Sequence, residues 1–167
     1  TFAFDAGTFR FGPILEGSKV ERTEGRFVDV EGVAVNPDVF DFQWFGGGEV
    51  ALDLNNLDDQ QMPRMGLRLQ AGASWKANLK NTDRTFTRYY SDLTFYLSLN
   101  NKQSIILASR IGMEDVAGDF EFYQAAVLDG NNNSRGYRRD RFYGNTSFYH
   151  QSDLRIKLLS SRDNGLF

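Results

Sequence analysis

The 167-residue sequence contains no cysteine and a single histidine, His150. The chain therefore has no disulfide, no thiolate metal site and no cluster of histidine ligands. Its formal net charge is −3, so no basic excess points to a nucleic-acid partner. No stretch approaches the roughly 18 consecutive apolar residues of a membrane helix, and the first residues lack the basic and apolar segments of a signal peptide. These absences leave a soluble protein, or one that meets a membrane without a spanning helix.

Proline is also scarce, at 3 residues, whereas the chain has 15 Phe, 7 Tyr and 16 Gly. Such an aromatic-rich composition is typical of β-proteins. Apolar and polar residues alternate with a period of two in four segments, 66–80, 86–100, 104–114 and 142–158. Three weaker segments before residue 49, "TFRFGPILEG", "GRFVDVEGVAV" and "VFDFQWF", bring the total to about seven strands. The sequence therefore predicts an all-β fold.

Strand length separates two kinds of antiparallel sheet. A half-buried sheet in a soluble protein would alternate in the same way, but its strands usually have about 5–6 residues. The alternation here extends over roughly 13–15 residues, more than the 9–11 that cross a bilayer on a tilt, which favours a transmembrane antiparallel β-barrel. Predicted to face lipid are Leu69, Ala71, Trp75, Leu93, Phe95, Leu97, Leu107, Ile111, Leu154 and Ile156. Predicted to face the lumen are Arg68, Lys76, Arg88, Asp92, Arg110, Asp153, Arg155 and Lys157.

The connections between strands divide into two groups. The tight turn at Asn100, the connection "NNLDDQQMPRM" and "SSRDNG" are predicted to lie on the periplasmic side. Residues 80–84 and a long loop of about 25 residues, 116–141, are predicted to be extracellular. Short periplasmic turns and longer extracellular loops are the arrangement of outer-membrane barrels. Residues 46–48, three glycines, are interpreted as a bulge or bend rather than a phosphate loop, because no helical pattern follows them.

The long loop and the strand after it carry a motif. The stretch "LDGNNNSRGYRRDRFYGNTSFYHQSDLRIKL" contains Ser134-Arg135-Gly136-Tyr137 and, in the strand, Asp153-Leu154-Arg155. It resembles the sixth extracellular loop and next strand of the BamA/TamA-like outer-membrane assembly barrels, the bacterial surface antigen superfamily, whose signature is an aliphatic residue followed by Arg-Gly-Phe/Tyr. Ser134 in place of the aliphatic residue and Asp129 in place of a glycine depart from it. With the similar stretch "DLNNLDDQQMPRMGLRLQAGASW", the resemblance covers about residues 45–167.

The resemblance implies a sixteen-stranded barrel whose loop folds back into the lumen. An arginine guanidinium can bind carboxylates bidentately on the lumen wall. Asp153 has lumen parity, so we expect it to be one partner of Arg135, with Gly136 allowing a close backbone approach and Tyr137 packing against the wall. From the residues alone, Arg135 also fits a solvated, arginine-rich loop.

The resemblance also implies a Gram-negative outer-membrane protein that assembles or translocates other proteins. Its expected partners are the lipid bilayer, substrate outer-membrane or secreted proteins, and periplasmic or lipoprotein accessory subunits. A barrel that anchors a fused hydrolase, patatin-like or a metallophosphoesterase, and a passive porin or transporter are the alternatives. Because an open sheet would leave unpaired edges in lipid, we expect residues 1–167 to be part of one barrel domain in a longer chain.

No residue pattern indicates catalysis, a metal or a cofactor, and we expect this segment not to be an enzyme. The acidic and amide residues between 129 and 140 approach the spacing of a calcium loop, but Ser134 stands where glycine is needed. His150 is interpreted as a barrel-surface residue near an aromatic girdle. Neither a Gly-x-Ser-x-Gly motif nor a dinucleotide-binding fingerprint is present.

Overall fold

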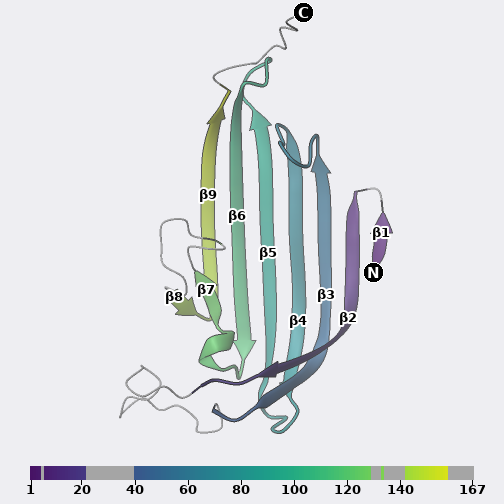
Figure 1. The fold of residues 1–167 in the computed structure, drawn as a ribbon, viewed down its shortest axis with the longest axis vertical. Coiled ribbons are helices and arrows are strands. Elements are labelled where there is room, and N and C mark those ends of the chain that lie inside the picture. Colours follow the sequence, from purple (N-terminus) through teal and green to yellow (C-terminus); the bar gives the residue numbers. More distant parts are fainter. Residues whose placement is uncertain (5, 22–39, 129–132, 134–141, 158–167) are drawn as a thin grey trace, which may run out of the picture.

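The computed structural model describes residues 1–4, 6–21, 40–128, 133 and 142–157, which are mostly β-strand (Figure 1). The elements are β1 (Phe2–Phe4), β2 (Gly7–Ser18), β3 (Gln43–Leu57), β4 (Gly66–Asn78), β5 (Thr85–Ser98), β6 (Ile105–Gly118), the 3₁₀ turn η3 (Phe122–Gln124), β7 (Ala126–Leu128), β8 (Phe142–Gly144) and β9 (Thr146–Ile156). Seven strands form one antiparallel sheet in the order β1-β2-β3-β4-β5-β6-β9, and β7 pairs with β8. The predicted all-β fold is confirmed, and within the described residues the sheet is open, with β1 and β9 at its edges.

The central strands are long enough to cross a bilayer. β3 has 15 residues, β4 has 13, and β5 and β6 have 14 each, against about 9–11 for a tilted transmembrane strand. The predicted strands at 66–80 and 86–100 agree with β4 and β5 to within two residues at each end.

Three predicted boundaries differ from the structure. The weak segment "VFDFQWF" ends at Phe45, whereas β3 continues to Leu57. The strand predicted at 142–158 is interrupted at Asn145, whose carbonyl oxygen accepts a hydrogen bond from the Val116 N–H (2.7 Å) between β8 and β9. β6 continues to Gly118, so the long loop begins at Asp119 rather than at 116. The weak segment "GRFVDVEGVAV" lies outside the described residues.

The cross-strand register places the alternating residues on opposite faces of the sheet. One row across β3 to β9 contains Leu54, Leu69, Leu93, Ile111 and His150. The adjacent row on the other side contains Asp53, Gln70, Asp92, Gly112 and Tyr149. We call these the apolar face and the polar face. All residues predicted to face lipid lie on the apolar face, and all those predicted to face the lumen lie on the polar face, apart from Lys157, which follows β9.

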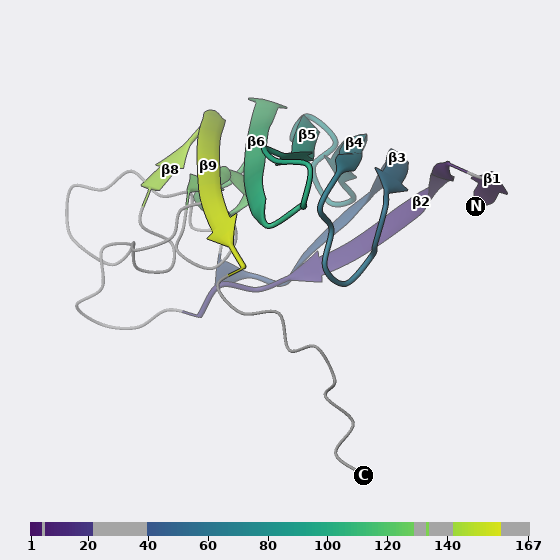
Figure 2. The same cartoon turned by 90° about the horizontal axis from the view of Figure 1, so that it is seen from above.

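The sheet is curved like a section of a barrel wall. β2 and the first part of β3 swing across the lower end on the polar side, so the polar face is concave (Figures 1 and 2). The β3–β4 and β5–β6 turns lie together at one end, here called the short-turn end (Figure 1). The β4–β5 turn and the segment after β6 lie at the other end, as the sequence predicts. Which end is periplasmic stays a prediction.

Residues 46–48 form no bulge, but they lie in the first part of β3, which curves across the lower end of the sheet as the alternative prediction of a bend expects (Figure 1). Gly47 pairs in unbroken register with Ile14 on β2 and Lys76 on β4. An added Cβ at Gly47 would stand 1.9 Å from the Trp75 carbonyl oxygen, so the glycine permits a close approach of two backbones. At Gly66, the first residue of β4, φ is +124°, a conformation that other residues rarely adopt.

Candidate functional site

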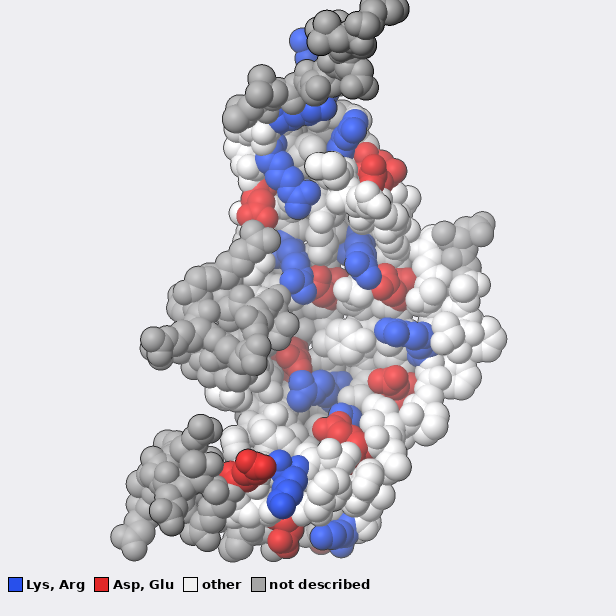
Figure 3. All heavy atoms as spheres, viewed as in Figure 1, with Lys and Arg blue, Asp and Glu red and all other residues white. Residues whose placement is uncertain are grey.

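Ion pairs between different strands and segments cover the polar face (Figure 3). The pairs are Arg68–Asp53 (2.8 Å), Arg110–Asp92 (2.7 Å), Arg84–Glu121 (3.1 Å), Arg88–Glu114 and Lys76–Glu16. Since each of these five cations has an anion beside it, this part of the face can carry many charges without a large net field of one sign. A polar, charged wall of this kind suits the interior of an outer-membrane barrel.

Asp92 is the centre of a hydrogen-bonded group on this face, here called the Asp92 cluster, with Thr94, Arg110 and Tyr149. The Asp92 carboxylate accepts bonds from Arg110 Nε (2.7 Å), Thr94 Oγ1 (3.3 Å) and the Tyr149 hydroxyl. The Arg110 guanidinium also lies 5.3 Å from the Tyr149 ring centroid, a cation–π contact. Every member of the cluster is therefore held by at least one other member.

A glycine allows Tyr149 to reach Asp92 from two strands away. The register runs Asp92, Gly112, Tyr149 across β5, β6 and β9. An added Cβ at Gly112 would stand 2.3 Å from the Tyr149 ring, so the ring lies flat across the glycine. This aromatic-over-glycine pairing fixes the tyrosine on the concave face.

The segment after β6 packs onto the polar face. Phe45, Phe86 and Val116 come from β3, β5 and β6, and they form a buried cluster with Ala126, against which Phe120 packs. Phe86 is 2% exposed and Val116 is 1% exposed. The concave face is therefore covered by protein at this end of the strands.

Polar contacts hold the same segment in place. They are Arg84 Nη1 to Glu121 Oε1 (3.1 Å), Arg88 Nη2 to the Gln124 carbonyl oxygen (2.5 Å) and the Ser18 Oγ to Tyr123 hydroxyl contact (3.1 Å). Burial raises the pKa of the Tyr123 hydroxyl, so Tyr123 stays neutral. The contacts join β2, β4–β5 and η3 across the concave face.

The predicted carboxylate Asp153 lies on the polar face of β9, opposite Ala108 in register. It lines a hollow of about 320 Å³ that Asp92 and Arg110 also line. The motif residues Ser134, Arg135, Gly136 and Tyr137 lie outside the described residues, so the contact between Arg135 and Asp153 stays a prediction.

Asn133, the residue before the motif, is described and lies beside the Asp92 cluster. It is 9% exposed, and its Nδ2 donates a hydrogen bond to the Val127 carbonyl oxygen (2.8 Å). With Asp92, Arg110 and Tyr149 it lines a hollow of about 480 Å³ on the polar face. Asn133 therefore lies on the polar face beside the Asp92 cluster, a proximity that sequence parity alone does not reveal.

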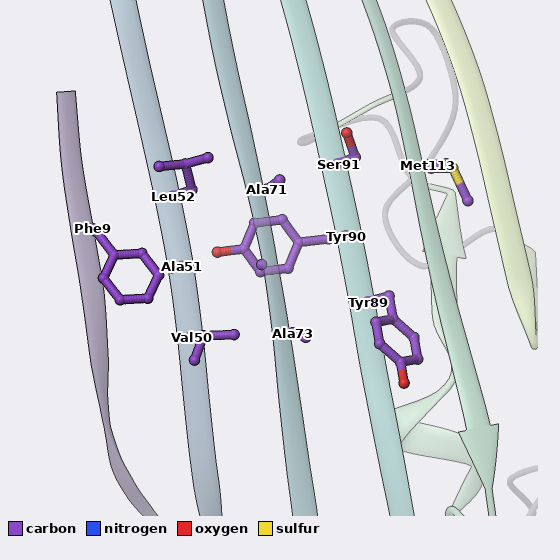
Figure 4. A pocket seen from close by; sticks show the side chains of 11 residues that line it. Phe9, Val50, Ala51, Leu52, Ala71, Ala73, Tyr89, Tyr90, Ser91 and Met113 are labelled. Atoms are coloured by element: carbon purple, nitrogen blue, oxygen red, sulfur yellow. The ribbon is translucent and has the colours of Figure 1, made fainter. Parts of the chain in front are cut away.

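The apolar face has a shallow hollow of about 410 Å³ over β4. Larger side chains surround the small Ala71 and Ala73 (Figure 4), namely Phe9, Val50, Leu52, Tyr89 and Met113. None of the described residues that line it is charged. Contact with lipid hydrocarbon suits this surface.

His150 lies on the apolar face, and two serines satisfy its ring nitrogen. Nε2 is 2.9 Å from Ser109 Oγ and 3.0 Å from Ser152 Oγ. The three polar residues occupy two successive rows of the apolar face. The row before them contains Met113 and Phe148, and the row after them contains Leu107 and Leu154. These hydrogen bonds lower the cost of three polar groups in apolar surroundings.

Among the described residues, no three His, Asp or Glu side chains gather into a group that could hold a metal ion. In the same part of the chain, no helix is long and apolar enough to cross a membrane.

Long strands, one apolar and one charged face, and a curved sheet define this chain as part of the wall of an outer-membrane type of β-barrel. The model of the Omp85 superfamily domain matches residues 42–163, and the chain belongs to this superfamily. The fold is similar to that in the crystal structure of BamA from Haemophilus ducreyi lacking POTRA domains 1-3, with a TM-score of 0.72 and 17% sequence identity. That match covers 96% of this chain and 36% of the BamA chain, so this chain spans about a third of the matched chain. Comparison with curated proteins found no match. The family resemblance drawn from the sequence is confirmed.

Proposed function

We propose that this barrel assembles outer-membrane proteins, or translocates proteins, in the outer membrane of a Gram-negative bacterium. Membership of the Omp85 superfamily over residues 42–163 carries the proposal, and the fold match to BamA supports it. The partners would be lipid, substrate outer-membrane or secreted proteins, and periplasmic or lipoprotein accessory subunits. No observation favours a hydrolase anchor or a passive porin over this role.

In this proposal the long loop is tethered inside the barrel by Arg135. Two features of the described residues support a loop that turns inward. The segment from Phe120 to Ala126 packs on the concave face, and Asn133 lies beside the Asp92 cluster. In this proposal the two residues after Asn133, which span at most about 7 Å, bring Arg135 to the wall that holds Asp153 and Asp92. A guanidinium bound there would order the loop and stabilise the wall.

The test of function uses the full-length protein in its own outer membrane. Depleting the protein should lower the amounts of folded outer-membrane or secreted proteins, measured by their heat-modifiable mobility on gels. Unchanged amounts of these proteins after depletion would refute the assembly and translocation role.

Arg135→Ala tests the tether. The variant should keep its strand content, lower the free energy of unfolding by about 3 kcal/mol if one buried partner is left uncompensated, and slow assembly. Asp153→Ala should have a smaller effect, and the double variant should cost less than the sum of the two single variants. Arg139→Ala removes the same charge from the same loop and serves as the control. If the effects of Arg135→Ala and Asp153→Ala on the free energy of unfolding add strictly, or if Arg139→Ala has an equal effect, Arg135 is not tethered and is a solvated loop residue.

A further inference from the structure

A hollow of about 470 Å³ lies at the short-turn end of the sheet, between the β3–β4 turn, the β5–β6 turn and the ends of β6 and β9. Four cations line it: Arg64, Lys102, Arg155 and Lys157. Blue side chains gather at this end in Figure 3. The described residues that line this basic hollow include apolar side chains but no acidic one. The hollow therefore combines positive charge with an apolar wall.

None of the ion pairs within the part of the chain that the structure describes includes a cation of the basic hollow. Arg64 Nη1 donates to the neutral Gln103 Oε1 (3.1 Å), and the Arg155 guanidinium lies 5.3 Å from the Tyr96 ring centroid. The positive charge of the hollow is therefore available to a ligand.

Two carboxylates near the hollow are used inside the β3–β4 turn. Asp58 Oδ1 accepts backbone hydrogen bonds from Arg64 (2.9 Å) and Met65 (3.1 Å). Asp59 Oδ1 accepts backbone hydrogen bonds from Gln61 (2.8 Å) and Met62 (3.1 Å). These bonds shape the turn and direct both acids to its backbone.

The other turn is held just as firmly. Asn100 Oδ1 accepts hydrogen bonds from the Ser104 N–H (2.8 Å) and the Ile105 N–H (3.2 Å). Gln103 has φ +50°, in the left-handed region that favours glycine. Its side chain nevertheless binds Arg64 and so joins the two turns.

We infer that the basic hollow docks an acidic segment of a partner protein. The carboxylates of that segment would pair with the four cations, and an apolar side chain would pack against Met62 and Ile106. Charge complementarity selects an acidic ligand. Ile156 of the apolar face also lines the hollow, but Ile106 and Arg155 are register partners on the polar face, and the basic side chains at this end are seen on the concave face in Figure 3. This placement favours a peptide over a lipid headgroup. If the short-turn end is periplasmic, as the sequence predicts, the partner is a periplasmic protein. Only this location of the partner rests on the proposed function.

The experiment uses the full-length protein in phosphatidylcholine nanodiscs and a short, labelled, glutamate-rich peptide with two leucines. A peptide with glutamine at every glutamate is the neutral probe. The double variant Arg64→Glu/Lys102→Glu reverses two charges of the hollow. Lys19→Glu/Lys80→Glu reverses two exposed charges at the opposite end and is the matched control.

The glutamate peptide should bind the natural protein and the control equally, and the hollow variant at least about tenfold more weakly. Binding should weaken as salt rises, and the neutral peptide should not bind. Lys102→Gln, a milder change on an exposed turn, should weaken binding by about threefold if the double variant does not fold. Equal binding to the natural protein and either hollow variant would overturn the inference. Displacement of the peptide by phosphatidylglycerol in the discs would assign the hollow to lipid instead. Because peptide binding needs no assembly activity, the site and the proposed function can fail separately.

Discussion

The same arginine substitution at two adjacent residues of β4 tests whether the two faces of the sheet have different surroundings. Leu69 lies on the apolar face opposite Leu93, and Gln70 lies on the polar face between Asp53 and Asp92. If the apolar face contacts lipid, Leu69→Arg places a charge in hydrocarbon. Gln70→Arg places the same charge between two carboxylates.

The depth of Leu69 in the membrane sets how far the free energies of unfolding of the two variants should differ. On β4 the apolar face runs from Leu67 to Trp75, with Ala71 at its centre. At about 3.4 Å per residue, Leu69 is about 7 Å from Ala71 along the strand, and about 5 Å along the membrane normal at a tilt of about 40°. It therefore lies in the inner half of an apolar band about 25 Å tall. We expect Leu69→Arg to lower the free energy of unfolding by about 2–3 kcal/mol, and Gln70→Arg to change it by less than about 1 kcal/mol.

The measurement is unfolding by urea in lipid vesicles, followed by heat-modifiable mobility on gels. Circular dichroism shows whether both variants keep their strand content. Equal free energies of unfolding for Leu69→Arg and Gln70→Arg would refute the assignment of the two faces.

Gly112→Ala should displace the Tyr149 ring and lower the free energy of unfolding by about 1–3 kcal/mol, because the new Cβ would stand 2.3 Å from the ring. Gly12→Ala, whose Cβ meets nothing within 4 Å, is the control in the same urea titration. Phe86→Ala should cost about 3 kcal/mol and raise hydrogen exchange in the segment after β6; unchanged protection there would contradict its packing. Backbone N–H donors lower the pKa of Asp58 from 3.8, so its stabilisation is complete above that value and is lost as pH falls through the lower, folded pKa. Amide protection in its turn should therefore fall in acid, and Asp58→Asn, which keeps the acceptor oxygen, should remove this dependence.

The long strands could be predicted because successive side chains of a strand point to opposite faces of the sheet, and one face here is apolar and the other polar. β4 and β5 alternate without interruption, and their predicted ends are correct to within two residues. β3 was harder to recognise, since residues 46–48 carry no side chain to show a face. Only the structure, in which β2 and β4 pair with β3 on either side, shows that the pairing of these glycines is unbroken.

The Asp92 cluster depends on register between strands, which alternation within one strand does not specify. Asp92 and Tyr149 are 57 residues apart. Parity predicts that both lie on the polar face, but the contact requires that Gly112 fall between them in the sheet. A prediction of this site needs the pairing of three strands.

The alternation is broken at one end of the sheet, and the break has a physical meaning. Asp115 lies on the apolar face, where its carboxylate accepts a hydrogen bond from Thr146 Oγ1, and Val116 lies on the polar face at 1% exposure. Phe45 and Phe86 are likewise buried on the polar face, and all three apolar residues stand at the same end of their strands. A water-filled lumen gives no reason to bury apolar side chains there, whereas a segment of chain packed into the lumen does. Apolar residues with lumen parity at matching strand ends therefore indicate, from sequence alone, where a loop turns inward.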